Sequence, residues 1–226
     1  MKPRVLISDK LSAQAVEIFK NNGVEADVKV GLKPEELLAI IGEYDGLAIR
    51  SATKVTPEVI KAGKRLKVVG RAGIGVDNVD REAATAAGVI VMNTPFGNSV
   101  TTAEHSIALM MALARKIPQA NESTHKGKWE KNKFEGVELM NKTLGLIGCG
   151  NIGSIVADRA QGLKMKVVAF DPFLSTERAA AINVEKVELD ALLSRADFIS
   201  LHTPMTDSTR HLLGKENLAK CKKGVR

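Results

Sequence analysis

A glycine-rich turn between a strand and a helix constrains the fold of this chain more than any other feature. Residues 142–147 read as a buried strand, the turn Gly148-Cys149-Gly150-Asn151-Ile152-Gly153 follows at once, and residues 154–163 read as a helix. A second apolar strand, 166–170, ends at Asp171, which lies 21 positions after the second glycine of the turn. Glycines at this spacing occur by chance, but this strand–turn–helix setting with a distal acidic residue predicts a dinucleotide-binding βαβ unit.

Each part of this motif has a physical reason. Gly148 permits the tight turn, Gly150 lets a pyrophosphate approach the backbone, and Gly153 lets the helix pack closely on the strand. The start of the helix offers unpaired N–H groups and partial positive charge to phosphates. Asp171 is suited to accept hydrogen bonds from ribose hydroxyls and would repel a 2′-phosphate, so we expect NAD rather than NADP. The alternative is a glycine-rich turn that holds no ligand.

The first 95 residues alternate short apolar runs with amphipathic stretches. Strands that alternate with helices at a spacing of about 20 residues indicate a parallel sheet covered on both faces. Five such units predict a flavodoxin-like α/β domain. The apolar runs are residues 5–7, 24–30, 46–49, 66–69 and 89–92.

The pattern changes after Pro95. Thr101 and Glu104 form a possible capping box for a long apolar helix over residues 102–116, which we expect to be buried between domains or subunits. His105 inside this helix is interpreted as a core histidine. A further strand, 198–201, precedes His202-Thr203-Pro204. Because ligands bind beyond the carboxyl ends of such strands, this loop should face the cofactor, with His202 in a packing role rather than as a base.

Composition excludes several functional classes. The N-terminus reaches Asp9 too early for a secretory segment, and no apolar stretch approaches the roughly 20 residues of a membrane span, so the cytoplasm is expected. Two cysteines provide neither a disulfide framework nor a metal site. The net charge of +7 raises the question of nucleic acid, but aromatic residues make up only 4%. The lysines around Trp129 fit a solvated loop, or secondarily a small anion; nucleic acid is a distant third.

Eight segments, spread from the first unit of the pattern to the last residue, have the composition of known motifs. These segments are Arg50–Thr56, Val69–Asp80, Met92–Pro95, Gly97–Ser99, Gly127–Glu130, the glycine turn, His202–Pro204 and Lys222–Arg226. Together they resemble the D-2-hydroxyacid dehydrogenases, and among them the branch that acts on 3-phosphoglycerate. The similarity runs from about residue 4 to the last residue.

This resemblance implies a substrate-binding (lid) domain over residues 1–97 and an NAD-binding Rossmann domain over residues 98–226. It also implies contacts to both ligands. The residues that would line the substrate pocket are Arg50, Ser51, Arg71, Gly73 and Asn98. The residues that would contact NAD are Gly148, Gly150, Asn151, Ile152, Gly153 and Asp171, with Thr203 and Pro204 on the adenosine side. Arginines suit a substrate with a carboxylate and a phosphate, although a surface ion pair is the alternative for Arg50 and Arg71.

The implied reaction is oxidation of 3-phosphoglycerate to 3-phosphohydroxypyruvate, the first step toward serine. The family's catalytic arginine follows a Lys-Lys-Gly-Val-Arg step, and its glutamate and histidine come later. We therefore expect an incomplete Rossmann domain that ends as a strand begins at residues 224–226, no catalytic residue, and little activity from this segment alone. Alternatives are a dehydrogenase for glyoxylate, hydroxypyruvate or another 2-hydroxy acid, and a non-enzymatic NAD-sensing protein. A homodimer or tetramer is expected, with helix 102–116 at the contact.

Overall fold

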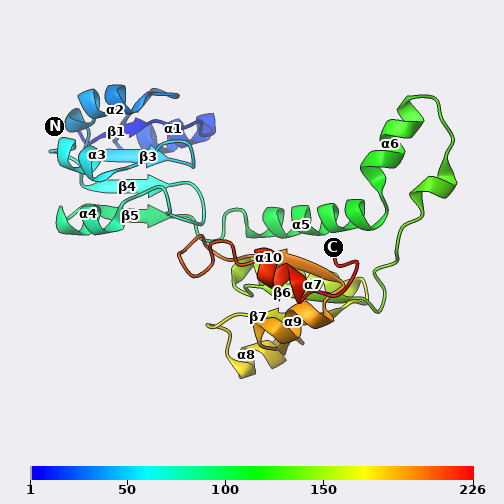
Figure 1. Ribbon diagram of the computed structural model, residues 1–226. Helices are drawn as coiled ribbons and strands as arrows, with labels where there is room; N and C mark the ends of the chain where they lie inside the picture. Colours follow the sequence, from blue (N-terminus) through cyan, green and yellow to red (C-terminus); the bar gives the residue numbers. More distant parts are fainter. Residues whose placement is uncertain (1) are drawn as a thin grey trace. The chain divides into compact units, whose positions relative to one another are not determined.

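The computed structural model describes residues 2–226, which divide into two compact units. The first unit extends to Asn98 and the second runs from Ser99 to Arg226. Both units are built from strands alternating with helices (Figure 1). No helix within residues 2–226 is long and apolar enough to cross a lipid bilayer.

The first unit contains a parallel sheet in the order β2-β1-β3-β4-β5. This is the strand order of flavodoxin-like folds, so that prediction is confirmed. The strands are β1 (Arg4–Ile7), β2 (Glu25–Val28), β3 (Gly46–Ile49), β4 (Val68–Arg71) and β5 (Ile90–Asn93). Strand β4 starts two residues later than the predicted run 66–69. Leu66 is buried, but it lies in the turn after a helix, where its N–H donates to Gly63 O at 2.8 Å.

Helices cover both faces of this sheet. Alternate residues of β1 show the two faces, because Leu6 packs into one apolar cluster and Val5 and Ile7 pack into another. The second cluster includes Val16 and Phe19 of the first helix. The helices of this unit are α1 (Ala13–Asn21), α2 (Pro34–Ile40), the 3₁₀ turn η1 (Ile41–Glu43), α3 (Pro57–Ala62) and α4 (Arg81–Ala86).

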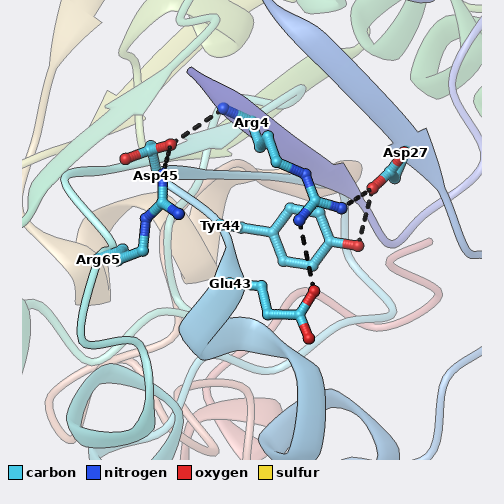
Figure 2. Close-up of polar contacts among 6 residues, drawn as sticks. All are labelled: Arg4, Asp27, Glu43, Tyr44, Asp45 and Arg65. Carbon is cyan, nitrogen blue, oxygen red and sulfur yellow. Dashed lines mark hydrogen bonds and ion pairs between the residues drawn. The ribbon is translucent and has the colours of Figure 1, made fainter. Parts of the chain in front are cut away.

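A polar network fixes the start of β1 (Figure 2). The Arg4 guanidinium donates to Asp27 at 2.8 Å and lies over the Tyr44 ring, 4.9 Å from its centroid. The Tyr44 hydroxyl also donates to Asp27, at 3.0 Å. Asp45 accepts from the Arg4 N–H at 3.0 Å and from Arg65 at 2.9 Å. These bonds tie β1, β2 and the segment before β3 together at the end of the sheet where β1 and β3 begin.

The second unit contains a parallel sheet in the order β8-β7-β6-β9. Counted along the chain from β6, this order is 3-2-1-4, as in a Rossmann sheet, and that prediction is confirmed. The strands are β6 (Thr143–Ile147), β7 (Lys166–Phe170), β8 (Glu185–Lys186) and β9 (Phe198–Leu201). The predicted strand at residues 224–226 is not formed. Arg226 nevertheless bonds through its backbone to Asp197 and Ile199, at 3.0 and 2.8 Å.

Two apolar clusters again lie on the two faces. The helices of this unit are α5 (Ser99–Ala114), α6 (Ile117–His125), the 3₁₀ turn η2 (Lys131–Phe134), α7 (Asn151–Gly162), α8 (Thr176–Ala181), α9 (Leu189–Arg195) and α10 (Lys215–Ala219). Leu144 and Leu146 belong to a cluster with residues of α5 and α7, whereas Ile147 packs with Leu192 and Leu193 of α9.

Helix α5 differs from its prediction at both ends and on one face. It starts at Ser99, so Thr101 and Glu104 lie inside it and the predicted capping box is wrong. It stops before Lys116, whose φ of 53° is left-handed and separates α5 from α6. His105 is exposed, because Ala103 and Ile107 are the side chains turned to the core. The interpretation of His105 as a core residue is therefore wrong.

Candidate functional site

Three loops meet at the carboxyl edge of the second sheet. The N–H of Gly148, directly after β6, donates to Phe170 O at the end of β7, at 2.9 Å. The N–H of His202, directly after β9, donates to Ile147 O at 2.8 Å. The glycine turn, the Asp171 segment and the His202–Pro204 segment therefore lie side by side, where parallel sheets bind ligands.

The three glycines of the turn have different surroundings. Gly148 has a φ of +91°, and a Cβ there would lie 2.6 Å from His202 O. A Cβ on Gly153 would lie 2.3 Å from Gly148 O, so the start of α7 packs directly on the turn. A Cβ on Gly150 would meet nothing within 4 Å. Packing within the protein therefore explains Gly148 and Gly153, while Gly150 leaves open space beside the N-terminus of α7, as a pyrophosphate would need.

Asp171 lies at the carboxyl edge of the second sheet and is also hydrogen-bonded to the glycine turn. Its carboxylate accepts from the Cys149 N–H at 2.7 Å and from the Phe173 N–H at 2.8 Å. Each oxygen uses one lone pair in these bonds and keeps another for a ligand hydroxyl. Burial, followed by the charge of Asp171, raises the pKa of the Cys149 thiol, which favours its protonated, unreactive form.

The loop after β9 closes the other side of the turn. The His202 ring bonds through Nε2 to Ser200 Oγ at 2.9 Å, and burial lowers its pKa, which favours the neutral imidazole. A Cβ on Gly148 would lie 3.0 Å from Thr203 Cγ2, which places Thr203 against the turn. Pro204 is exposed next to it. Asn151 and Ile152 form the first turn of α7, so all predicted cofactor residues lie at one edge.

In the first unit, four of the five predicted substrate residues lie at the carboxyl ends of β3 and β4: Arg50, Ser51, Arg71 and Gly73. Ile49 and Arg71 are paired in register, and the Ala72 N–H donates to Ile49 O at 2.8 Å. Arg50 and Ser51 therefore lie beside the segment from Arg71 to Gly73. Asn98 is exposed at the end of this unit, and within residues 2–226 no hydrogen bond joins it to these four residues.

The two arginines differ in their surroundings. The side chain of Arg71 is only 12% exposed and donates through Nη1 to Asp77 at 2.7 Å. Its Nε is buried and has no partner among the described residues. Arg71 thus forms an ion pair, but from a largely buried position that leaves one donor unsatisfied. Arg50 is exposed to solvent.

Sequence reasoning missed the residues that hold Arg50 in place. Asp9, two residues after the end of β1, accepts from the Arg50 N–H at 2.6 Å and from the Thr53 hydroxyl at 2.7 Å. Asn78 donates to Arg50 O at 2.7 Å and to Thr53 O at 2.6 Å. A polar residue that follows a buried strand was the available signal for Asp9. Its partners could not be identified without the strand order.

The lysine-rich segment around Trp129 carries no comparable arrangement. Lys126 pairs with Glu122, and Lys133 pairs with Glu130 at 2.6 Å. Trp129 is 84% exposed. Intervening acidic residues therefore offset part of the positive charge of this segment.

Comparison with known proteins assigns the chain to a family. Residues 107–226, more than half of the chain, match the family model described as "D-isomer specific 2-hydroxyacid dehydrogenase, NAD binding domain". The chain belongs to the D-isomer-specific 2-hydroxyacid dehydrogenase family. The match covers the glycine turn, Asp171 and the His202–Pro204 loop, so the NAD-binding domain of this family lies within the second unit, and NAD is the cofactor it is built to hold.

Relatives of the chain extend the similarity to the first unit. The D-3-phosphoglycerate dehydrogenase of Archaeoglobus fulgidus is 50% identical over 222 residues, which cover 98% of this chain and 42% of that protein. The chain therefore spans less than half the length of this curated relative.

Two solved structures are also similar. The TT0316 protein of Thermus thermophilus has a TM-score of 0.88 at 34% identity and covers 97% of this chain and 70% of that one. The NAD+-bound 3-phosphoglycerate dehydrogenase of Entamoeba histolytica has a TM-score of 0.83 at 32% identity, over 100% and 70% of the two chains. The likeness to the Entamoeba histolytica enzyme agrees with the same family.

Proposed function

We propose that this chain belongs to an NAD-dependent dehydrogenase that oxidises 3-phosphoglycerate to 3-phosphohydroxypyruvate, a step toward serine. The observation that carries the proposal is the 50% identity to a D-3-phosphoglycerate dehydrogenase, which extends over 98% of the chain and so includes both units. The alternative substrates, glyoxylate and hydroxypyruvate, lack the phosphate, so the anion-binding residues of the first unit decide between them.

The first unit acts as the substrate-binding domain in this proposal. A substrate with a carboxylate and a phosphate requires several cationic or N–H donors. Arg50 and Arg71 supply two guanidinium groups from adjacent strand ends. Ser51, Gly73 and Asn98 complete the proposed set.

The second unit acts as the NAD-binding domain. Gly148 and Gly153 shape the turn, Gly150 leaves room for the pyrophosphate, and the N–H groups of Asn151 and Ile152 face the phosphates from the N-terminus of α7. Asp171 accepts from the ribose hydroxyls, while Thr203 and Pro204 line the adenosine side. When bound, NAD supplies the acceptor for the hydride that leaves the substrate carbon.

We also infer that the protein forms a homodimer or tetramer through α5. Leu109 and Leu113 on this helix are 58% and 54% exposed. They border a cavity of about 210 Å³ between α5 and the strands β6 and β9, which is lined mainly by apolar side chains. An exposed apolar helix face of this kind is typical of subunit contacts. Analytical ultracentrifugation of the chain and of a Leu109→Glu variant tests this inference, and a wild-type monomer at micromolar concentration would contradict it.

Binding calorimetry tests the substrate assignment. We expect the chain to bind 3-phosphoglycerate more tightly than D-glycerate, which lacks only the phosphate. Arg50→Ala should weaken 3-phosphoglycerate binding at least about tenfold, or about 1.4 kcal/mol. The control Lys67→Ala removes a cation whose side chain is 80% exposed, just before β4 begins, and should have no effect. Equal affinity for D-glycerate and 3-phosphoglycerate would mean that another 2-hydroxy acid is the substrate.

A further inference from the structure

The segment from Arg50 to Thr53 is held by side chains on two sides. On one side, the Asp9 carboxylate accepts the Arg50 N–H at 2.6 Å, the Thr53 N–H at 3.2 Å and the Thr53 hydroxyl at 2.7 Å. On the other, the Asn78 amide donates to Arg50 O at 2.7 Å and to Thr53 O at 2.6 Å. The backbone N–H and C=O of both Arg50 and Thr53 are thus bound by side chains from outside the segment.

The two side chains have complementary chemistry. Asp9 is 6% exposed and only accepts here, whereas the bonds from Asn78 are all donated. Ser8 adds a contact to the Thr53 hydroxyl at 2.9 Å. A buried carboxylate is costly to retain unless it is fully hydrogen-bonded, and these three N–H and O–H donors supply the bonds of Asp9.

This arrangement leaves the middle of the segment free for a ligand. Ser51 and Ala52 are exposed, and within residues 2–226 neither of their N–H groups donates to a protein acceptor. They lie next to the exposed Arg50 side chain. Two consecutive N–H groups beside a guanidinium are suited to an anion, provided that the backbone is held in place before the anion arrives.

We propose that Asp9 and Asn78 are positioning residues that hold Arg50 and Ser51 ready for the substrate anion. Neither touches the substrate; each acts through the backbone of Arg50 and Thr53. Without them, binding would have to order this segment, and the affinity would fall by the entropy lost in doing so. The inference rests on the proposed function, in which Arg50 and Ser51 contact the substrate.

The test combines binding with backbone dynamics. Asp9→Asn keeps the shape of the side chain but turns an amide NH₂ toward one of the donors now facing the carboxylate. We expect the dissociation constant for 3-phosphoglycerate to rise at least about tenfold. The ¹⁵N order parameters of Ser51 and Ala52 should fall from about 0.85 toward about 0.6. The dissociation constant for NAD should not change, because the glycine turn lies in the other unit.

Asp27→Asn is the matched control. It makes the same substitution on a carboxylate of the same unit that accepts from Arg4 and Tyr44 and does not touch the Arg50 segment. It should lower the melting temperature yet leave 3-phosphoglycerate affinity unchanged. A second pair, Thr53→Val and Thr53→Ser, removes and then restores the hydroxyl bonded to Asp9. Valine should weaken 3-phosphoglycerate binding and serine should restore it. This pair of variants tests the proposal even if Asp9→Asn does not fold.

The outcomes separate the two proposals. Unchanged affinity and unchanged order parameters in both Asp9→Asn and Thr53→Val would overturn the positioning role while leaving the substrate assignment intact. If the wild-type chain binds NAD but no 3-phosphoglycerate, the substrate assignment fails. The order parameters then decide the positioning role: a segment still rigid in Asp9→Asn overturns it, and a mobile one supports it.

Discussion

Substitutions at three glycines of α7 and the preceding turn should separate the packing of the turn from its contact with NAD. In Gly153→Ala, the new Cβ would lie 2.3 Å from Gly148 O, whereas ordinary contact begins at 3.4 Å. Helix α7 or the turn must then move by about 1 Å. The atoms that must move belong to the backbone, which shifts less easily than a flexible side chain. Forcing a methyl group into a packed interior costs about 1–3 kcal/mol. Gly153→Ala should therefore lose both stability and NAD affinity.

Gly150→Ala should lose NAD affinity with little loss of stability. Its Cβ would meet no protein atom within 4 Å, and its φ of −75° lies outside the left-handed region that favours glycine. Its ψ of −146° departs from the values that alanine prefers, so we expect the free energy of unfolding to fall by no more than about 1 kcal/mol. The methyl group would instead occupy the open space beside the N-terminus of α7 and keep a phosphate away from the N–H groups. We expect the NAD dissociation constant to rise at least about tenfold, or about 1.4 kcal/mol.

Gly162→Ala is the matched control. Gly162 is the last residue of the same helix, and its Cβ would also meet nothing within 4 Å. Alanine there should stabilise the helix by about 0.4–1 kcal/mol and leave NAD binding unchanged. Urea unfolding and calorimetric titration with NAD measure both quantities for all three variants. Wild-type NAD affinity in Gly150→Ala would refute the reasoning, because the open space would then not be where the pyrophosphate lies.

Three further predictions concern stability. Tyr44→Phe should lower the free energy of unfolding by about 1 kcal/mol, because it removes a hydrogen bond to the Asp27 carboxylate. The Asp27 side chain is 39% exposed, and solvent reduces the strength of this hydrogen bond. An unchanged urea midpoint would contradict the prediction. The bond from Arg4, followed by that from Tyr44, holds the pKa of Asp27 below 3.8, so this stabilisation is present above the unfolded pKa and is lost as the pH falls through the folded pKa. Urea midpoints from pH 7 to 3 should fall more steeply in wild type than in Asp27→Asn. Burial lowers the pKa of His202 below 6.5, so unfolding takes up a proton and stability should decline as the pH falls from 6.5 toward the folded pKa. His202→Asn should lack that decline, and a decline as large as in wild type would assign it to another group.

The alternation of apolar runs with helical stretches was enough to predict both sheets, because each βα unit is a local pattern. Errors occurred where a local pattern did not determine the outcome. Leu66 is apolar and buried, but it contributes to the core from a turn rather than from β4. Thr101 and Glu104 have capping-box spacing, yet the helix begins earlier at Ser99, which is buried at 4% exposure.

The grouping of residues at the carboxyl edge of the second sheet was easier to predict than the contacts of the Arg50 segment, for a physical reason. The glycine turn and α7 are contiguous, so spacing alone brings Gly148, Gly150 and Gly153 together. The Arg50 segment depends instead on partners 41 and 28 residues away, Asp9 and Asn78. Those contacts follow only once β1, β3 and β4 are known to be neighbours in the sheet. Spacing within the sequence contains no such information.

Asp171 shows how the two kinds of information combine. Its position after β7 predicts a hydrogen-bond acceptor for a ribose, and that reasoning treats the carboxylate as facing a ligand. In the structure the same carboxylate also binds the N–H groups of Cys149 and Phe173, so it holds the glycine turn and the segment after β7 together. A change at Asp171 therefore alters the shape of the turn along with the charge presented to the nucleotide. Because the turn also packs on His202, cofactor preference in this domain is coupled to the geometry of all three loops at the sheet edge.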